Sequence, residues 1–93
     1  MDEVDRGSIV LSLRGHDKDN LFVVVGFEGE NYLLLADGKF RLISKPKKKK
    51  LKHCRLVSFE GSERITEKLK TGIKVNDAEL RKVIKLFSKE EAI

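Results

Sequence analysis

The sequence predicts a small, mainly β domain: a five-stranded, closed or nearly closed barrel with a C-terminal helical extension. Two observations lead to this fold class. Five short runs suited to strands, joined by polar or glycine-containing turns, lie within about fifty residues. After Gly61 the spacing of apolar residues changes from alternation to the three- and four-residue spacing of helices. With 93 residues in total, we assign residues 7–60 to the barrel and residues 61–93 to a two-helix extension packed on it.

The first two strands follow from apolar runs bounded by turns. Residues 7–15 (GSIVLSLRG) predict one strand, and residues 16–20 (HDKDN) predict the turn after it. Residues 21–27 (LFVVVGF) form the most apolar run, which is too short for a free-standing helix and therefore predicts a central strand. Gly26 within this run indicates a bulge or a bend, and residues 28–31 turn the chain again.

A hairpin is predicted next, because Asp37-Gly38 separates two strand-like runs, residues 32–36 and 39–43. Both turn residues tolerate positive φ, which makes this pair a strong hairpin signal. Residues 51–59 supply the fifth strand.

Two helices are predicted beyond Gly61. Ser62 can cap a helix that runs to Lys70 and ends at Thr71-Gly72. Residues 76–79 (NDAE) have the form of a capping box before a helix over about residues 77–87. That helix carries an apolar stripe, for which we expect the barrel as the cover and keep a partner protein as the alternative: Leu80, Val83, Ile84 and Phe87.

Most of the basic character lies in residues 45–55 (KPKKKKLKHCR), which we call the basic segment. It holds seven Lys or Arg residues and no acid, whereas the chain as a whole has a formal charge of +5, so the remainder sums to −2. A solvated loop and a nuclear-import signal are two explanations. Because Pro46 stiffens its start and its far end resembles a strand, we favour phosphate binding by an anchored segment.

Composition bounds the cellular setting. One cysteine excludes an internal disulfide and fits a reducing compartment. No apolar stretch approaches the ~20 residues of a membrane span, and the acidic N-terminus is unlike a signal peptide. We therefore expect a cytoplasmic protein that does not enter membranes.

The sequence offers little for catalysis or metal binding. His53 and Cys54 are adjacent, so on a strand they point to opposite faces and cannot act jointly. We expect Cys54 in the core, His53 on the outer face beside the lysines, and His16 without a partner ligand. Asp17 and Asp19 are interpreted as parts of a solvated polar turn. We predict no enzymatic activity, no cofactor and no metal site.

Aromatic side chains do not suggest a stacking surface. Phe22, Phe27, Phe40 and Phe59 fall in strand patterns and are predicted to be core residues, and Tyr32 is a single exposed ring. Cationic contact with a phosphate backbone is the chemistry that remains.

Residues 7–10 (GSIV) and 15–18 (GHDK), followed by the apolar strand at 22–25, resemble the KOW motif of ribosomal and transcription-associated proteins. Residues 36–55 (ADGKFRLISKPKKKKLKHCR) are similar to the fourteen-e family of archaeal and eukaryotic large-subunit ribosomal proteins. Small KOW-containing RNA-binding proteins of bacteria also show this pattern, with a helical tail like residues 75–85, and the chain most resembles that bacterial type.

This resemblance implies a Src-homology-like small barrel that binds RNA, with ribosomal RNA as the expected target, ribosomal proteins as further partners, and a monomeric state. One departure is that Asp19 stands where the motif has glycine. Asp can adopt the left-handed conformation, but its charge weakens the turn as a phosphate contact, so we weight the basic segment above the turn. The residues expected to face RNA are Arg14, Lys18, Lys45, Lys47, Lys48, Lys49, Lys50, Lys52 and His53.

Two other functions stay open. One is a protein-interaction module that docks a partner through a barrel edge or the helix face at residues 80–87, with the lysines serving only solubility. The other is a DNA-associated factor, which differs only in the preferred polymer.

Overall fold

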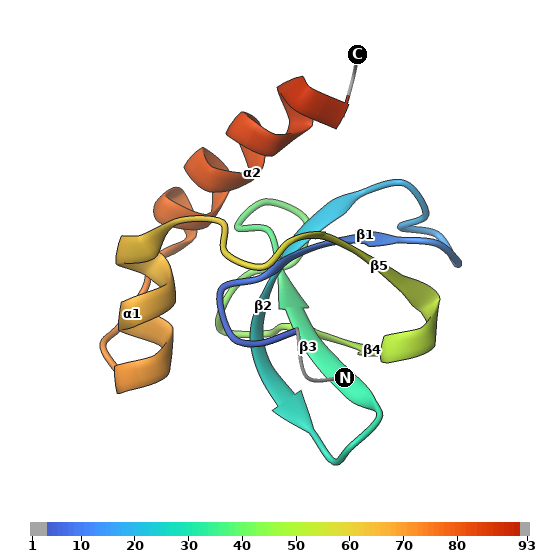
Figure 1. Cartoon of the computed structure of the whole chain (residues 1–93), viewed down its shortest axis with the longest axis horizontal. Coiled ribbons are helices and arrows are strands. Elements are labelled where there is room, and N and C mark those ends of the chain that lie inside the picture. Colours follow the sequence, from blue (N-terminus) through green and yellow to red (C-terminus); the bar gives the residue numbers. More distant parts are fainter. Residues whose placement is uncertain (1–3, 92–93) are drawn as a thin grey trace.

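A computed structural model describes residues 4–91 of the chain, so the last two residues of the predicted extension (92–93) lie outside the described part. Five strands and two α-helices form its framework (Figure 1). They are β1 (Ile9–Ser12), β2 (Leu21–Glu28), β3 (Tyr32–Ala36), β4 (Lys47–Lys50), the 3₁₀ turn η1 (Leu51–His53), β5 (Cys54–Ser58), α1 (Glu63–Thr71) and α2 (Asp77–Glu91).

The strands form one antiparallel sheet in the order β4-β3-β2-β1-β5. The predicted mainly β architecture with C-terminal helices is confirmed, but the sheet does not close into a barrel. β4 and β5 are its two edges, and the chain crosses from one edge to the other through η1 without forming a ladder between them. One turn of 3₁₀ helix reverses direction there, so the two edge strands diverge instead of pairing.

Both faces of the sheet are buried, which explains the unbroken apolar run of β2. Leu21 and Val23 join α1 and α2 in one cluster, the helix-side core. Phe22 and Val24 point the other way into a second cluster, the inner core, which also contains residues of β1 and β3. The predicted irregularity at Gly26 is confirmed by a shift in the β2–β3 register at that position.

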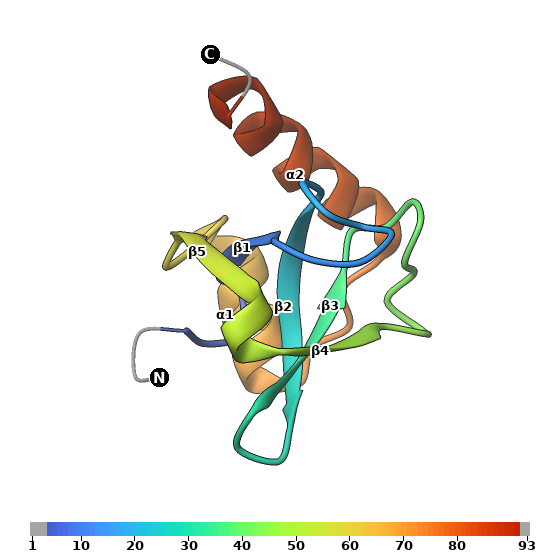
Figure 2. The same cartoon turned by 90° about the vertical axis from the view of Figure 1, so that its right-hand side faces the viewer.

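The helices begin where the capping signals predict. Ser62 Oγ accepts a hydrogen bond from Ile65 N at 3.4 Å. Asn76 and Glu79 form the reciprocal capping box, since each backbone N–H donates to the other's side chain at 2.9 and 3.2 Å. The apolar stripe of α2 packs against the sheet in the helix-side core, with Leu80 fully buried. Figure 2 shows α1 and α2 on the same side of the curled sheet.

The predicted hairpin at Asp37-Gly38 is wrong, because residues 39–43 form a loop and not a strand. The Asp37 side chain accepts hydrogen bonds from the backbone N–H groups of Lys39, Phe40 and Arg41 at 2.9–3.0 Å. This carboxylate folds the chain back on itself and leaves none of those N–H groups for a ladder. The place beside β3 is taken by β4, the lysine run itself.

The prediction that four phenylalanines lie in the core is also wrong for three of them. Phe22 is buried, but Phe27, Phe40 and Phe59 are 36%, 71% and 61% exposed. Phe40 is in the loop that replaces the predicted strand, and Phe59 follows the last residue of β5. Phe27 lies near the end of β2, beyond the part covered by either core.

Candidate nucleic-acid interface

The lysine run forms edge strand β4, so its side chains alternate between two faces. Lys49 stands opposite Leu33, whose side chain belongs to the inner core. Lys47 and Lys49 therefore point to the concave side of the sheet, and Lys48 and Lys50 point outward. The alternation matches the burial, since Lys49 is only 7% exposed while Lys50 is exposed.

Asp17 forms ion pairs with both inward lysines. Lys47 Nζ lies 2.8 Å from Asp17 Oδ2, and Lys49 Nζ lies 2.8 Å from Asp17 Oδ1. Ser12 Oγ donates to the same carboxylate at 3.0 Å, and Lys49 Nζ also donates to the carbonyl of Arg14. Burial alone would raise the pKa of Asp17, but the hydrogen bonds from the two lysines and Ser12 hold that pKa well below its usual value.

The prediction that Asp17 belongs to a solvated turn is therefore wrong. Its side chain is buried beneath the turn and joins the turn to β4. Because Lys47 and Lys49 already have this internal counter-ion, they are poorly placed as primary contacts for a phosphate backbone.

Lys48 is paired as well, on the outer face. Its Nζ lies 2.5 Å from Glu28 Oε2 and 4.5 Å from the centre of the Tyr32 ring. The hydrogen bond and the charge of Glu28 raise the pKa of Lys48. An RNA phosphate would therefore have to compete with Glu28 for this ammonium group.

Arg14, Lys50 and Lys52 lie near His53 and act on its pKa. Burial first, and then the positive charges of Arg14, Lys52, Lys50 and Lys49, lower the pKa of His53. The Leu13 N–H donates to the His53 carbonyl at 2.9 Å, which fixes the end of β1 beside η1. We call Arg14, Lys50, Lys52 and His53 the cationic cluster.

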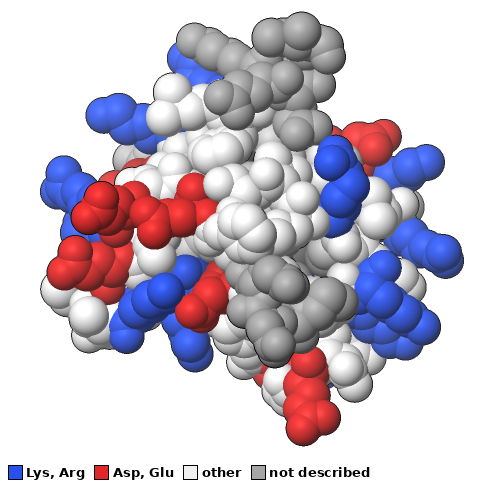
Figure 3. Space-filling model, in the orientation of Figure 1, with Lys and Arg blue, Asp and Glu red and all other residues white. Residues whose placement is uncertain are grey.

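No carboxylate neutralises this cluster among residues 4–88, whose side chains are described. Arg14, Lys50 and Lys52 are exposed and make no ion pair with any of those residues. Figure 3 shows Lys and Arg side chains along the right-hand edge of this face, where β4 and β5 approach each other in Figure 1. Most acidic side chains visible on this face lie over α1 and toward the lower edge. The right-hand edge of this face is thus mainly cationic, whereas the left side carries Lys and Arg beside the acids.

Lys18 and Lys45 are exposed but are not part of the cationic cluster. Lys18 is in the first turn, whose conformation agrees with the expectation for Asp19: that residue adopts a left-handed φ of 72°. Lys45 lies in the loop before β4, where its N–H donates to the Leu42 carbonyl at 2.9 Å.

The predicted strand over residues 51–59 is shorter than expected, because residues 51–53 form η1 and β5 begins at Cys54. His53 is therefore not on a strand. Cys54 is half-buried against the inner core and not within it, and burial raises the pKa of its thiol. No group of three or more His, Cys, Asp or Glu side chains within the described range is arranged to hold a metal ion.

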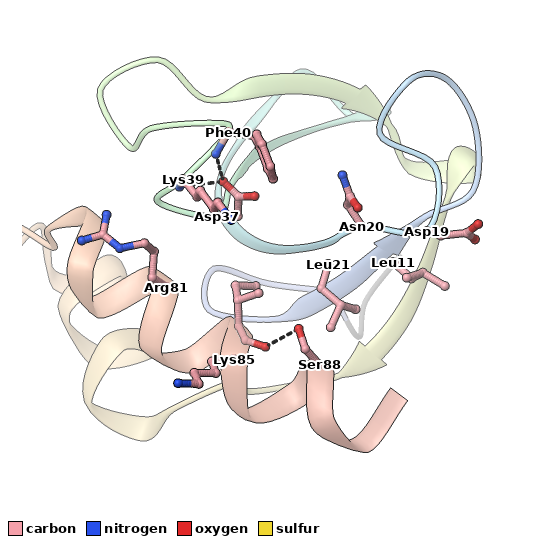
Figure 4. A pocket seen from close by; sticks show the side chains of 11 residues that line it. Leu11, Asp19, Asn20, Leu21, Asp37, Lys39, Phe40, Arg81, Lys85 and Ser88 are labelled. Carbon is pink, nitrogen blue, oxygen red and sulfur yellow. Dashed lines mark hydrogen bonds between the residues drawn. The ribbon is translucent and has the colours of Figure 1, made fainter. Parts of the chain in front are cut away.

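A hollow beside the first turn was missed by sequence reasoning, which placed Phe40 in the core. We call it the Phe40 hollow; it lies between the first turn and the loop after β3, and is lined by His16, Asp17, Asn20, Phe22, Phe40, Arg41 and Lys47. A second hollow, on the α2 side, shares Asn20 and Phe40 with it (Figure 4). The only signal in the sequence is the Asp37-Gly38 pair, which is compatible with a loop as well as with a hairpin.

A scan of the chain against protein-family models gives no match, and a search of curated proteins gives no significant match. In the part of the chain that the structure describes, neither helix is long and apolar enough to cross a membrane. The case for a function rests on the side chains described above and on the motifs in the sequence.

Proposed function

We propose that this chain is a non-enzymatic RNA-binding domain of the KOW type that grips backbone phosphates with the cationic cluster, on or near the ribosome. The observation that carries the proposal is that Arg14, Lys50 and Lys52 are exposed and make no ion pair with any described residue. The hydrogen bond from the Leu13 N–H to the His53 carbonyl brings the turn that carries Arg14 to η1. Unpaired like charges on one surface repel one another, and a bound polyanion would relieve the repulsion.

The distribution of acids supports this assignment. Asp17 pairs with Lys47 and Lys49, and Glu28 pairs with Lys48, so two carboxylates offset most of the charge of these three lysines. The cationic cluster receives no such counter-ion from the described residues. The site is therefore narrower than the sequence predicts: we retain Arg14, Lys50, Lys52 and His53 as principal contacts.

The resemblance to KOW proteins points to RNA as the polyanion. The turn that carries the motif and the basic segment are far apart in the sequence, yet Lys49 touches both the Arg14 carbonyl and Asp17 of that turn. The two regions that carry the resemblance thus form one continuous surface. Exposed cations from both are available to the same strand of RNA.

The alternative of a protein-docking helix face is less favoured. Leu80 and Val83 are covered by the sheet and are 0% and 5% exposed, so the face predicted to dock a partner already has one within the chain.

The proposal is tested by the salt dependence of RNA affinity. Lys50→Gln combined with Lys52→Gln removes two exposed charges and no ion pair seen in the structure. Each phosphate contact with a single strand contributes ~0.7 to the slope of log affinity against log salt concentration. We expect the slope to fall by at most about 1.4, with RNA still preferred over a DNA duplex competitor.

A matched control is Lys74→Gln combined with Lys82→Gln, which changes net charge equally at exposed sites away from the cluster. An equal loss of slope in the control, or no loss in the test variant, would show that the cationic cluster is not the binding site. Neutralising Lys47 and Lys49 is unsuitable, because it would disrupt the Asp17 ion pairs as well.

A further inference from the structure

We propose that the Phe40 hollow receives one unpaired base of the bound RNA, stacked on the Phe40 ring, so that the preferred ligand is a single strand. This inference rests on the RNA binding proposed above and specifies the form of RNA recognised.

Phe40 is presented to solvent by a firmly held loop. Its ring is 71% exposed, although its own N–H is one of the three that Asp37 binds. The loop is also tied to α2, because Arg81 Nη1 donates to the Gly38 carbonyl at 2.6 Å and Ile43 N donates to Asp77 Oδ1 at 2.7 Å. An exposed aromatic ring held on an ordered loop is ready to stack, with little ordering entropy left to lose.

The exposed Phe40 ring borders the Phe40 hollow as well as the hollow on the α2 side. The nearest cation to the ring is Lys39, whose Nζ lies 5.1 Å from the ring centre. Lys39 borders the hollow on the α2 side but is not among the residues that line the Phe40 hollow. A base that enters the Phe40 hollow can therefore reach the ring, and stacking on an aromatic ring tolerates any base.

The other residues of the Phe40 hollow suit a nucleotide. Asn20 and Phe40 line both hollows, and Figure 4, which draws the hollow on the α2 side, shows them on different segments of the chain. The Asn20 amide can both donate to and accept from a base edge. Arg41 adds positive charge beside the hollow, whereas the charge of Lys47 is offset by Asp17, which also lines it.

The Phe40 hollow is linked through β4 to the turn that carries Arg14. Lys47 lines it and shares Asp17 with Lys49, which reaches the backbone of Arg14. A strand with its base at Phe40 can thus run along β4 toward Lys50 and Lys52. A base paired within a duplex cannot enter the hollow without leaving its stack, so single-stranded RNA should bind more tightly than duplex RNA.

The chain contains no tryptophan, so Phe40→Trp introduces a unique fluorescent reporter at the site. The probe is a single-stranded oligouridylate of about eight nucleotides, within the ~4–16 that comparable domains cover. We expect the oligonucleotide to quench the fluorescence of the introduced indole, while inorganic polyphosphate, which has charge but no bases, competes without quenching. Phe40→Ala should weaken oligonucleotide binding about tenfold, with little change in the salt slope.

Phe59 is the matched control, because it is 61% exposed and lies outside the Phe40 hollow. Phe59→Trp should show no quenching, and Phe59→Ala no loss of affinity. Two results would refute the base-binding site but not the proposed function. One is salt-dependent RNA binding without selective quenching of the Phe40→Trp protein. The other is equal affinity for duplex and single-stranded RNA. A wild-type protein that binds no RNA would overturn both.

Discussion

Replacing Asp17 with Asn should destabilise this protein more than any change to its exposed charges. Asp17 is the shared counter-ion of Lys47 and Lys49, and Lys49 is 7% exposed. The variant keeps the size and the hydrogen-bonding capacity of the side chain but leaves two ammonium groups beside a neutral amide. One of these groups has almost no access to water that could replace the lost charge.

The magnitude follows from this burial. Removing one partner of a buried ion pair costs roughly 3–5 kcal/mol, because the remaining charge is buried without compensation. The amide oxygen of the variant can still accept from Ser12 and from one lysine, and Lys47 retains some exposure at 24%. We therefore expect the lower end, about 3 kcal/mol, which is a large part of the ~5–15 kcal/mol by which a domain is stable.

Urea unfolding at neutral pH measures this loss. With a slope of about 1 kcal/mol per molar urea for a small domain, the midpoint should fall by about 3 M. Asp19→Asn is the matched control: it makes the same change two residues away on an exposed side chain, and Asn tolerates the φ of 72° found there. That control should shift stability by no more than about 0.5 kcal/mol. Equal stability of the two variants would refute the structural role of Asp17.

The same carboxylate makes stability depend on pH in a defined direction. Because the pKa of Asp17 is lowered on folding from an ordinary value of 3.8, its contribution is fully present above that value and is lost as pH falls below it. The difference in unfolding free energy between wild type and Asp17→Asn should therefore shrink on acidification below about pH 4. A difference that stays constant down to about pH 2 would contradict the assignment.

Three further predictions concern the loop after β3, the cationic cluster and the α2 cap. Gly38→Ala should lower the stability of the protein clearly more than Gly29→Ala. Both glycines have positive φ, but a Cβ at position 38 would overlap the Asp77 carbonyl oxygen, whereas the space around Gly29 is open. Thermal melts of the two variants would compare them, and equal melting temperatures would refute the predicted clash. The His53 imidazole should titrate below 6.5 in the free protein, and its pKa should rise on RNA binding because phosphates favour the imidazolium; an NMR titration with an unchanged or lowered pKa would count against phosphate contact. Asn76→Ala should cost about 1 kcal/mol in urea unfolding through loss of the cap on α2, and an unaltered midpoint would show that the capping box contributes little.

Much of the fold was predictable because local chemistry and tertiary structure agree. Alternation and turns located β1, β2 and β3, and capping residues located both helices to within a few positions. The prediction of a hairpin failed because an aspartate can cap a loop with its side chain as readily as it can occupy a tight turn. In this chain the Asp37 side chain accepts hydrogen bonds from three consecutive N–H groups. The loop conformation also depends on hydrogen bonds between α2 and the backbone of Gly38 and Ile43.

The candidate site was predicted only in part, since charge in a sequence does not reveal which charges are paired. Lysine is disfavoured in strands, so four consecutive lysines give no signal for a strand. Once these residues are known to form a strand, the alternation of side chains between its two faces places Lys47 and Lys49 on one face and Lys48 and Lys50 on the other. The role of Asp17 could not be predicted in this way, because its partners follow it by about thirty residues and meet it only through the order of strands in the sheet.

A run of identical residues raises the question of what sets its register, since a one-residue slip of β4 would present Lys48 and Lys50 to Asp17 with the same chemistry. The ends of the strand supply the answer. Leu51 packs against the inner core and its N–H donates to the Asn31 carbonyl at 2.8 Å, so a slip would remove an apolar side chain from its cluster and break that bond. Pro46, at the other end, has no N–H to extend the ladder. The residues that flank the lysines thus determine which of them are buried counter-ions of Asp17 and which remain exposed to bind phosphate.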